Sequence, residues 1–204
     1  MGIHKLSSGR VGRPRKVSDD DVFMGAYKAM QRIGPGELTL ADIAAEAGLT
    51  AGALVQRFGS KRALLLKIAE QFAGGTAAMF AKLRQAHRSP LAALRAYADC
   101  MAGMAATPEA LIRNLSYLQT DLTDPEFRQH FAKSARATRD ELQKLIRDAI
   151  RAGELVPSTN PKQLARTVEA VIGGSMLSWA HYQEGSSAKW IRDDLNAILK
   201  PYLK

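Results

Sequence analysis

The side chains best suited to bind another molecule lie close together in the first third of the chain. Gln56 and Arg57 are adjacent, and their amide and guanidinium groups are the donors that proteins use to bind adenine and guanine. The small residues Ala51, Gly52 and Ala53 precede them and would let the backbone approach a surface closely. This combination predicts recognition of bases in a duplex groove rather than a chemical reaction.

Nearby residues are suited to hold phosphates. Thr39 and Thr50 each precede a short apolar-periodic segment and are expected to cap two helices. The free amide groups at the start of the helix after Thr39 are placed to hold phosphate. Lys61 would add a positive side chain at the start of a further helix. A simpler interpretation is that the threonines only cap helices and that Gln56, Arg57 and Lys61 form an ordinary solvated face. The predicted DNA-contacting set is Arg13, Arg15, Thr39, Ala41, Thr50, Ala51, Gly52, Val55, Gln56, Arg57 and Lys61.

The sequence lacks the patterns that support catalysis or metal binding. Its four histidines, His4, His87, His130 and His181, are scattered without metal-ligand spacing. There is neither a nucleophile elbow nor a phosphate-cradling glycine loop. Cys100 stands among Ala and Met, which indicates a small buried hydrophobe rather than a redox sensor, since a sensor needs exposure and nearby positive charge. We expect no enzymatic activity, no metal site and no cofactor.

The overall composition fits a folded protein with a polyanionic partner. The 204 residues are 46% hydrophobic and 24% charged, which excludes intrinsic disorder, and a single cysteine excludes a disulfide scaffold. The formal net charge is +9, and the first 18 residues contain several Lys and Arg but no acidic residue. Since neither a signal-peptide pattern nor an 18-residue apolar run occurs, we expect a cytoplasmic protein without a membrane segment.

Hydrophobic periodicity predicts an all-α protein of about nine helices. The first helix follows the cap Ser18 and ends by Gly34-Pro35-Gly36. Two helices of about eight residues follow at 39–47 and 50–58, joined by a turn that contains glycine, which is the helix-turn-helix pattern. A fourth helix starts at Lys61, and four of the five later helices start near the prolines at 90, 108, 125 and 161.

Residues 19–65 resemble the DNA-binding domain of the TetR/AcrR family of transcriptional regulators. The resemblance is carried by the apolar spacing and glycine turn of the segment from Thr39 to Thr50 and by the Lys-x-x-Leu-Leu start at Lys61. It implies a homodimer on a palindromic operator, a helical C-terminal domain that binds a small molecule, and usually repression relieved by that ligand. The chain departs from the family at Val55, where a Tyr that touches operator phosphate is common.

With this resemblance the chain divides into three predicted parts. Residues 1–17 form a flexible basic arm, 18–65 the helix-turn-helix domain, and 66–204 a helical domain for effector binding and dimerisation. Within the arm, Gly12-Arg13-Pro14-Arg15 resembles short basic elements that enter the minor groove at A·T tracts, although a tail that adds only non-specific attraction is the alternative. The second boundary lies inside the fourth helix, so that helix is the expected lever between effector and DNA.

Two residue sets are expected in the C-terminal part. The dimer interface is predicted on the last two helices, and the alternative is that its residues close the chain's own core: Val168, Val171, Ile172, Ser175, Met176, Trp179, Trp190, Leu195, Ile198 and Leu199. The effector pocket is predicted from a methionine and aromatic stripe, for which plain core is the alternative: Met79, Phe80, Tyr97, Cys100, Met101, Met104, Tyr117, Phe127 and Phe131.

The sequence therefore predicts a ligand-responsive DNA-binding regulator, most simply a repressor with a hydrophobic or amphipathic effector, because no buried charge cluster is evident. Its expected partners are double-stranded operator DNA, the effector, and a second copy of the chain. A different class of function is a basic helical adaptor that uses the same face for protein, RNA or anionic membrane.

Overall fold

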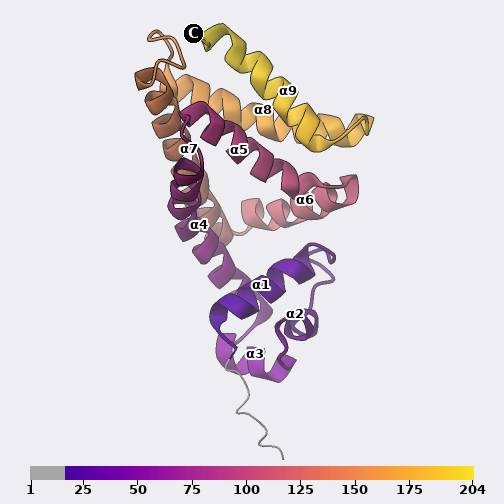
Figure 1. The fold of residues 1–204 in the computed structure, drawn as a ribbon. Helices are drawn as coiled ribbons and strands as arrows, with labels where there is room; N and C mark the ends of the chain where they lie inside the picture. The colour runs from indigo at the N-terminus through magenta and orange to yellow at the C-terminus, as the bar shows by residue number, and fades with distance from the viewer. Residues whose placement is uncertain (1–16) are drawn as a thin grey trace, which may run out of the picture.

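The computed structural model describes residues 17–204, and over this range it confirms an all-α fold of nine α-helices (Figure 1). The helices are α1 Asp19–Met30, α2 Leu40–Ala47, α3 Ala51–Phe58, α4 Lys61–Ala86, α5 Pro90–Ala102, α6 Pro108–Thr123, α7 Pro125–Arg151, α8 Pro161–Tyr182 and α9 Ser187–Leu199. Short 3₁₀ turns follow α5 and α9, at Gly103–Ala105 and Lys200–Tyr202. None of the helices in the described range is long and apolar enough to cross a membrane.

The helix starts follow from local side-chain chemistry. Ser18 and Thr39 each accept a hydrogen bond from the amide three residues on. The carboxylates of Asp21 and Asp42 accept a hydrogen bond from the backbone N–H of the cap residue, which completes two capping boxes. Helix α1 ends at Met30, a few residues before the predicted Gly-Pro-Gly end, and the chain between these points forms turns.

The first three helices and the start of α4 enclose a small core. Its fully buried members come from all four helices and from the loop before α2: Val22, Ala26, Ala29, Leu38, Ile43, Leu54 and Leu64. Helices α1 and α2 approach each other closely at Gly25, where a Cβ atom would lie 3.0 Å from the backbone nitrogen of Ala47 and 3.1 Å from its Cβ.

Replacing Gly25 by alanine is expected to destabilise the protein by about 1–3 kcal/mol, because the added methyl group forces two packed backbones apart. Gly74→Ala is the matched control, since an added Cβ there meets nothing within 4 Å. In an open helical position, glycine to alanine usually stabilises by about 0.5–1 kcal/mol. Urea unfolding of both variants would measure the two changes, and a stabilised Gly25→Ala variant would show that α1 and α2 can separate at no cost.

A second, larger core lies among α4, α5, α7, α8 and α9. Phe80, Leu94, Leu142, Ile146 and Leu195 are among its buried members. Helix α4 runs without interruption from Lys61 to Ala86, through Gly74 and Gly75, and contributes Leu64 to the first core and Phe80 to the second. A single helix therefore reaches both cores. Figure 1 shows α4 running from the N-terminal helices to lie beside α7.

Candidate DNA-binding interface

The turn between α2 and α3 determines how α3 is presented. Gly48 has a φ of 67°, in the left-handed region that favours glycine, and the N–H of Leu49 donates to the carbonyl of Ala44 at 2.9 Å. Thr50 Oγ1 then accepts a hydrogen bond from the Ala53 N–H at 3.1 Å and starts α3. The predicted helix-turn-helix is confirmed.

Helix α3 has one buried and one open face. Leu54 is fully buried, and the Phe58 ring packs on Phe23 with their centroids 6.1 Å apart. On the opposite side Gly52, Val55 and Gln56 are exposed, and a Cβ added at Gly52 would meet only Thr50 Oγ1, at 3.9 Å. The first turn of α3 thus presents a shallow surface that a duplex groove can accept.

Arg57 differs from its predicted role as a freely projecting base reader. Its guanidinium donates to the backbone carbonyl of Val17 at 2.8 Å and pairs with the carboxylate of Asp19. It also stands over the Phe58 ring, with Cζ 5.5 Å from the centroid. The side chain therefore joins the end of α3 to the start of α1. Sequence reasoning did not pair Arg57 with Asp19, 38 positions earlier, because only the fold brings them together.

Lys61 also departs from the prediction. Its ammonium group donates to the carbonyls of Leu38 at 2.7 Å and Pro35 at 3.3 Å, so it holds the loop between α1 and α2 instead of projecting outward. Thr39 and Thr50 cap their helices, as both interpretations of the sequence expected, and the exposed Ala41 lies in the first turn of α2. Arg13 and Arg15 lie outside the described residues.

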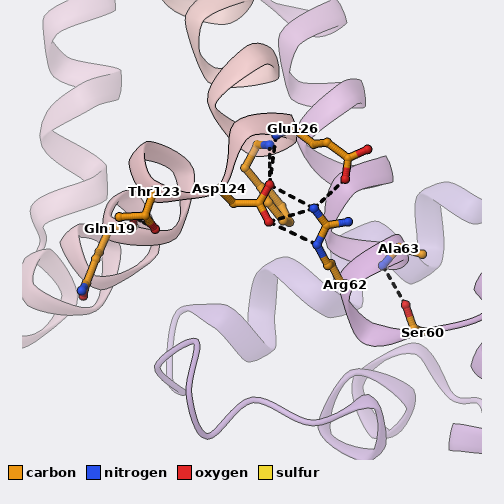
Figure 2. Close-up of polar contacts among 8 residues, drawn as sticks. Ser60, Arg62, Ala63, Gln119, Thr123, Asp124 and Glu126 are labelled. Atoms are coloured by element: carbon orange, nitrogen blue, oxygen red, sulfur yellow. Dashed lines mark hydrogen bonds and ion pairs between the residues drawn. The ribbon is translucent and has the colours of Figure 1, made fainter.

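A cluster that sequence reasoning missed lies where α4 meets the junction of α6 and α7. Arg62 donates to both carboxylate oxygens of Asp124, with nitrogen–oxygen distances of 2.8 to 3.2 Å, and pairs with Glu126 at 2.5 Å. Figure 2 shows these three side chains meeting. Asp124 ends α6 and caps α7, accepting the Glu126 N–H at 3.0 Å. The Phe127 ring lies 5.8 Å from Arg62 Cζ. One arginine of α4 therefore holds the α6–α7 junction.

Two further contacts join α6 to the end of α1. The hydroxyl of Tyr117 donates to the carbonyl of Ile33 at 2.8 Å, and Arg113 Nε donates to the carbonyl of Gln31 at 2.7 Å. Burial raises the pKa of Tyr117 to about 12, so its hydroxyl remains a donor at physiological pH. These contacts place α6 against the segment that follows α1 in the N-terminal domain.

The hydrogen bonds from Arg62 hold the pKa of Asp124 below its usual value. A carboxylate with a lowered folded-state pKa adds stability at pH values above its unfolded pKa of about 3.9, and that stability is lost as the pH falls through the folded pKa. Asp124→Asn should therefore flatten the pH dependence of urea unfolding below about pH 4, while the asparagine still caps α7. Identical pH profiles for the two proteins would show that the pair adds no stability.

The predicted dimer residues divide between the core and the surface of α8 and α9. Val168, Ile172, Trp179, Leu195 and Leu199 are buried inside the chain itself, as the alternative held. Ser175 is also buried, and its hydroxyl donates to Asp194 at 2.7 Å. These six side chains have almost no area left for a partner, which corrects that part of the prediction. The other four members are half-buried: Val171, Met176, Trp190 and Ile198.

The predicted pocket residues do not gather at one place. Phe80 and Tyr97 stack in the larger core with centroids 4.9 Å apart, and Met79 and Met101 pack against that core. Met104 and Phe131 are exposed, while Tyr117 and Phe127 lie at the contacts with α1 and α4 described above.

Cys100 is exposed, which contradicts its interpretation as a small buried hydrophobe. It follows the exposed Asp99 on α5, and helical periodicity alone did not separate this outer face from the buried one at Tyr97 and Ala98.

Comparison with known families decides what this architecture is. The family model for bacterial regulatory proteins of the tetR family matches residues 24–68, and that for the tetracyclin repressor-like C-terminal domain matches residues 116–195. The chain belongs to the TetR family. It is a ligand-responsive DNA-binding transcriptional regulator, and this membership does not favour the adaptor alternative. TetR-family regulators are DNA-binding proteins rather than enzymes, and they are typically dimeric.

Solved structures share the fold of this TetR-family chain. A TetR transcription regulator from Haloarcula marismortui has a TM-score of 0.74 and 16% identity, with 91% of this chain and 98% of that chain covered. SmeT, the repressor of the Stenotrophomonas maltophilia multidrug efflux pump SmeDEF, has a TM-score of 0.65 and 22% identity, with 93% of this chain and 92% of that chain covered. FadR from Thermus thermophilus, in complex with lauroyl-CoA, has a TM-score of 0.57 and 23% identity, with 89% of this chain and 93% of that chain covered. No curated protein sequence matches the chain.

Proposed function

We propose that this TetR-family regulator is a repressor that binds a two-fold symmetric operator as a homodimer and leaves it when an apolar or amphipathic small molecule binds. The observation that carries the proposal is the open face of α3, where Gly52, Val55 and Gln56 are exposed while Leu54 anchors the helix from behind. A helix held in this way fits the major groove, which is about 12 Å wide.

Within this proposal, few side chains read bases. Gln56 is the main candidate, since its amide can bind adenine in a bidentate manner, and Ala51 and Gly52 allow close approach. Phosphates are held by the amide ends of α2 and α4, at Ala41 and Lys61, with the ammonium of Lys61 committed to its own loop. Val55 contributes apolar contact in place of the phosphate contact that a tyrosine would make.

We propose that the dimer forms through the outer faces of α8 and α9. Ala170, Gly174 and Leu177 recur at helical spacing on α8 and are exposed, and Leu177 keeps 44% of its surface. An added Cβ at Gly174 would meet nothing within 4 Å, so another helix can pack closely there. The half-buried Val171 and Trp190 extend the same proposed interface.

We propose that the boundary between the N-terminal and C-terminal domains lies inside α4. Control of DNA binding would run along two routes between these domains. One route is α4 itself, which reaches both cores. The other is the α6–α7 junction, which holds Arg62 and contacts the end of α1 through Tyr117. An effector that shifts α6 or α7 would therefore move the helix-turn-helix by direct contact, and such coupling is typically worth about 1–3 kcal/mol.

An apolar effector is supported by exposed apolar side chains on the two helices that meet at the α6–α7 junction, namely Leu115 and Phe131. Two proteins that share this fold have solved structures in complex with such molecules, SmeT with triclosan and FadR with lauroyl-CoA. These two compounds make practical first probes, because one is a small aryl molecule and the other an acyl thioester.

Selection from a library of random duplexes tests the proposal. The purified chain should enrich one motif with two-fold symmetry and half-sites about one helical turn apart, and it should sediment as a dimer with that DNA. Enrichment of no motif, or of an asymmetric motif bound by one chain, would refute the proposal.

A further inference from the structure

We infer that Gly74 and Gly75 form a hinge in the middle of α4, and that the ion pairs of Arg62 keep this hinge straight in the DNA-binding state. When those pairs break, the helix-turn-helix turns relative to the C-terminal domain. The inference rests on the proposed function, because it names the element that moves when the α6–α7 junction releases Arg62.

The packing of the described residues does not require glycine at position 74 or 75. Both glycines are exposed within an unbroken helix, and a Cβ atom added at either would meet nothing within 4 Å. Glycine is among the least favourable residues in a helix interior, because its backbone loses the most conformational freedom there. Two adjacent glycines therefore make this turn the easiest place for α4 to bend.

The glycines lie between the parts of α4 that belong to the two cores. Ile68 is the last residue of α4 in the N-terminal core, and Met79 is the first that packs against the larger core. No side chain from Ala73 to Ala78 is larger than threonine. Helix α4 thus has two well-packed ends joined by a thin middle segment.

Polar contacts on the two sides of the glycines join α4 to different domains. Before them, Gln71 Nε2 donates to the carboxylate of Asp20 on α1 at 2.9 Å. After them, the hydroxyl oxygens of Thr76 and of Ser134 on α7 lie 3.5 Å apart. The change from contacts with one domain to contacts with the other therefore falls at the glycine pair.

Open space beside the glycines gives the hinge room to move. A groove of about 550 Å³ lies between α1 and α4, and its lining includes Phe23, Gly74 and Gly75. The two halves of α4 can bend towards this space before they meet atoms of α1. Small residues that absorb a change in backbone angles between two packed bodies are the usual form of a hinge.

The ion pairs of Arg62 span the hinge. Arg62 precedes the glycines and binds Asp124 and Glu126 at the start of α7, whereas Phe80, after the glycines, is buried in the core that α4 shares with α7. Because α7 holds α4 on both sides of the glycine pair, the helix stays straight while these contacts persist. Loss of the Arg62 pairs frees the first half of α4 from these bonds to α7.

A rescue experiment tests the hinge. The double variant Gly74→Ala/Gly75→Ala stiffens α4 in its straight form, so it should bind the selected duplex as wild type does. Arg62→Ala should lose about 5- to 150-fold in affinity. Adding the two alanines to Arg62→Ala should restore affinity to within about threefold of wild type, because the stiffened helix keeps the helix-turn-helix units at the competent spacing.

Gly103→Ala is the matched control, since Gly103 is an exposed glycine with helical backbone angles outside α4 and has open space around it. It should restore no affinity to Arg62→Ala. The inference is overturned if the triple variant binds as weakly as Arg62→Ala, or if Arg62→Ala binds like wild type. It is also overturned if the two alanines alone weaken binding, because the DNA-binding state would then need a bent α4.

Amide hydrogen exchange tests the hinge without DNA. In the wild-type protein, amides of residues 74–79 should be less protected than those of 64–68 and 80–84, and the two alanines should raise their protection by about 5- to 30-fold. Uniform protection along α4 that the alanines do not change would contradict the hinge. A wild-type chain that selects no duplex but exchanges rapidly at 74–79 would refute the proposed function and support the hinge, so the two failures are distinguishable.

Discussion

Gly52→Glu is expected to reduce affinity for the selected duplex at least 100-fold without lowering stability. Position 52 lies in the exposed first turn of α3, where an added side chain meets only Thr50 Oγ1 at 3.9 Å, so the fold accepts it. In the groove, the new carboxylate would face base edges and phosphates at close range. Like charges brought together at an interface cost several kcal/mol, and each 1.4 kcal/mol is a factor of ten.

Gly103→Glu provides the matched control for charge. Gly103 is exposed in the 3₁₀ turn after α5, has helical backbone angles, and leaves open space for a side chain. Its substitution adds the same charge far from α3 and should change affinity by less than threefold at about 0.15 M salt, where the Debye length is about 8 Å. Equal losses in the two variants, measured by fluorescence anisotropy, would mean that net charge rather than α3 governs binding.

The second large effect is expected at Arg62. Arg62→Ala removes the bonds to Asp124 and Glu126, so the α6–α7 junction no longer holds the start of α4. The two helix-turn-helix units of a dimer would then sample spacings that do not fit the operator, and apparent affinity falls with the fraction of competent molecules. We expect a loss of about 5- to 150-fold, which corresponds to the usual range of coupling energies.

Lys67→Ala is the control for Arg62→Ala. Lys67 also lies on α4 and loses an ion pair, but its partner Glu70 is on the same helix at 2.9 Å. Arg62→Lys should recover only part of the affinity, because an ammonium cannot form the bidentate bond. Wild-type affinity in Arg62→Ala would exclude the Arg62 pairs from control of DNA binding and leave α4 and the contacts of α6 through Tyr117 and Arg113 as the remaining routes.

The helices and their caps were predictable because they depend on neighbouring residues. Ser18, Thr39 and the Asp124-Pro125 pair mark helix starts within four residues of sequence, and the glycine turn before α3 is equally local. The open face of α3 followed from the spacing of Leu54 and Phe58.

The partners of the charged residues were not predictable in this way. Arg57 meets Val17 across 40 positions and Arg62 meets Asp124 across 62, and each pairing exists only once the helices pack. Hydrophobic periodicity also identifies an apolar residue on a helix, but it does not determine whether the same chain, a partner or solvent contacts that residue. For this reason Val168 on α8 could be assigned to a partner although it fills the chain's own core, and Cys100 could be assigned to the interior although it is exposed.

A competition titration on the selected duplex tests most directly whether α3 reads DNA. At about 0.15 M salt, wild-type protein should bind this duplex at least 1,000-fold more tightly than a scrambled duplex of the same composition. Gln56→Ala should remove about 1–3 kcal/mol of discrimination at one base pair in each half-site and leave the other positions unchanged. Equal affinity for the selected and scrambled duplexes, or loss of discrimination spread evenly over all positions in Gln56→Ala, would contradict the proposed role of α3.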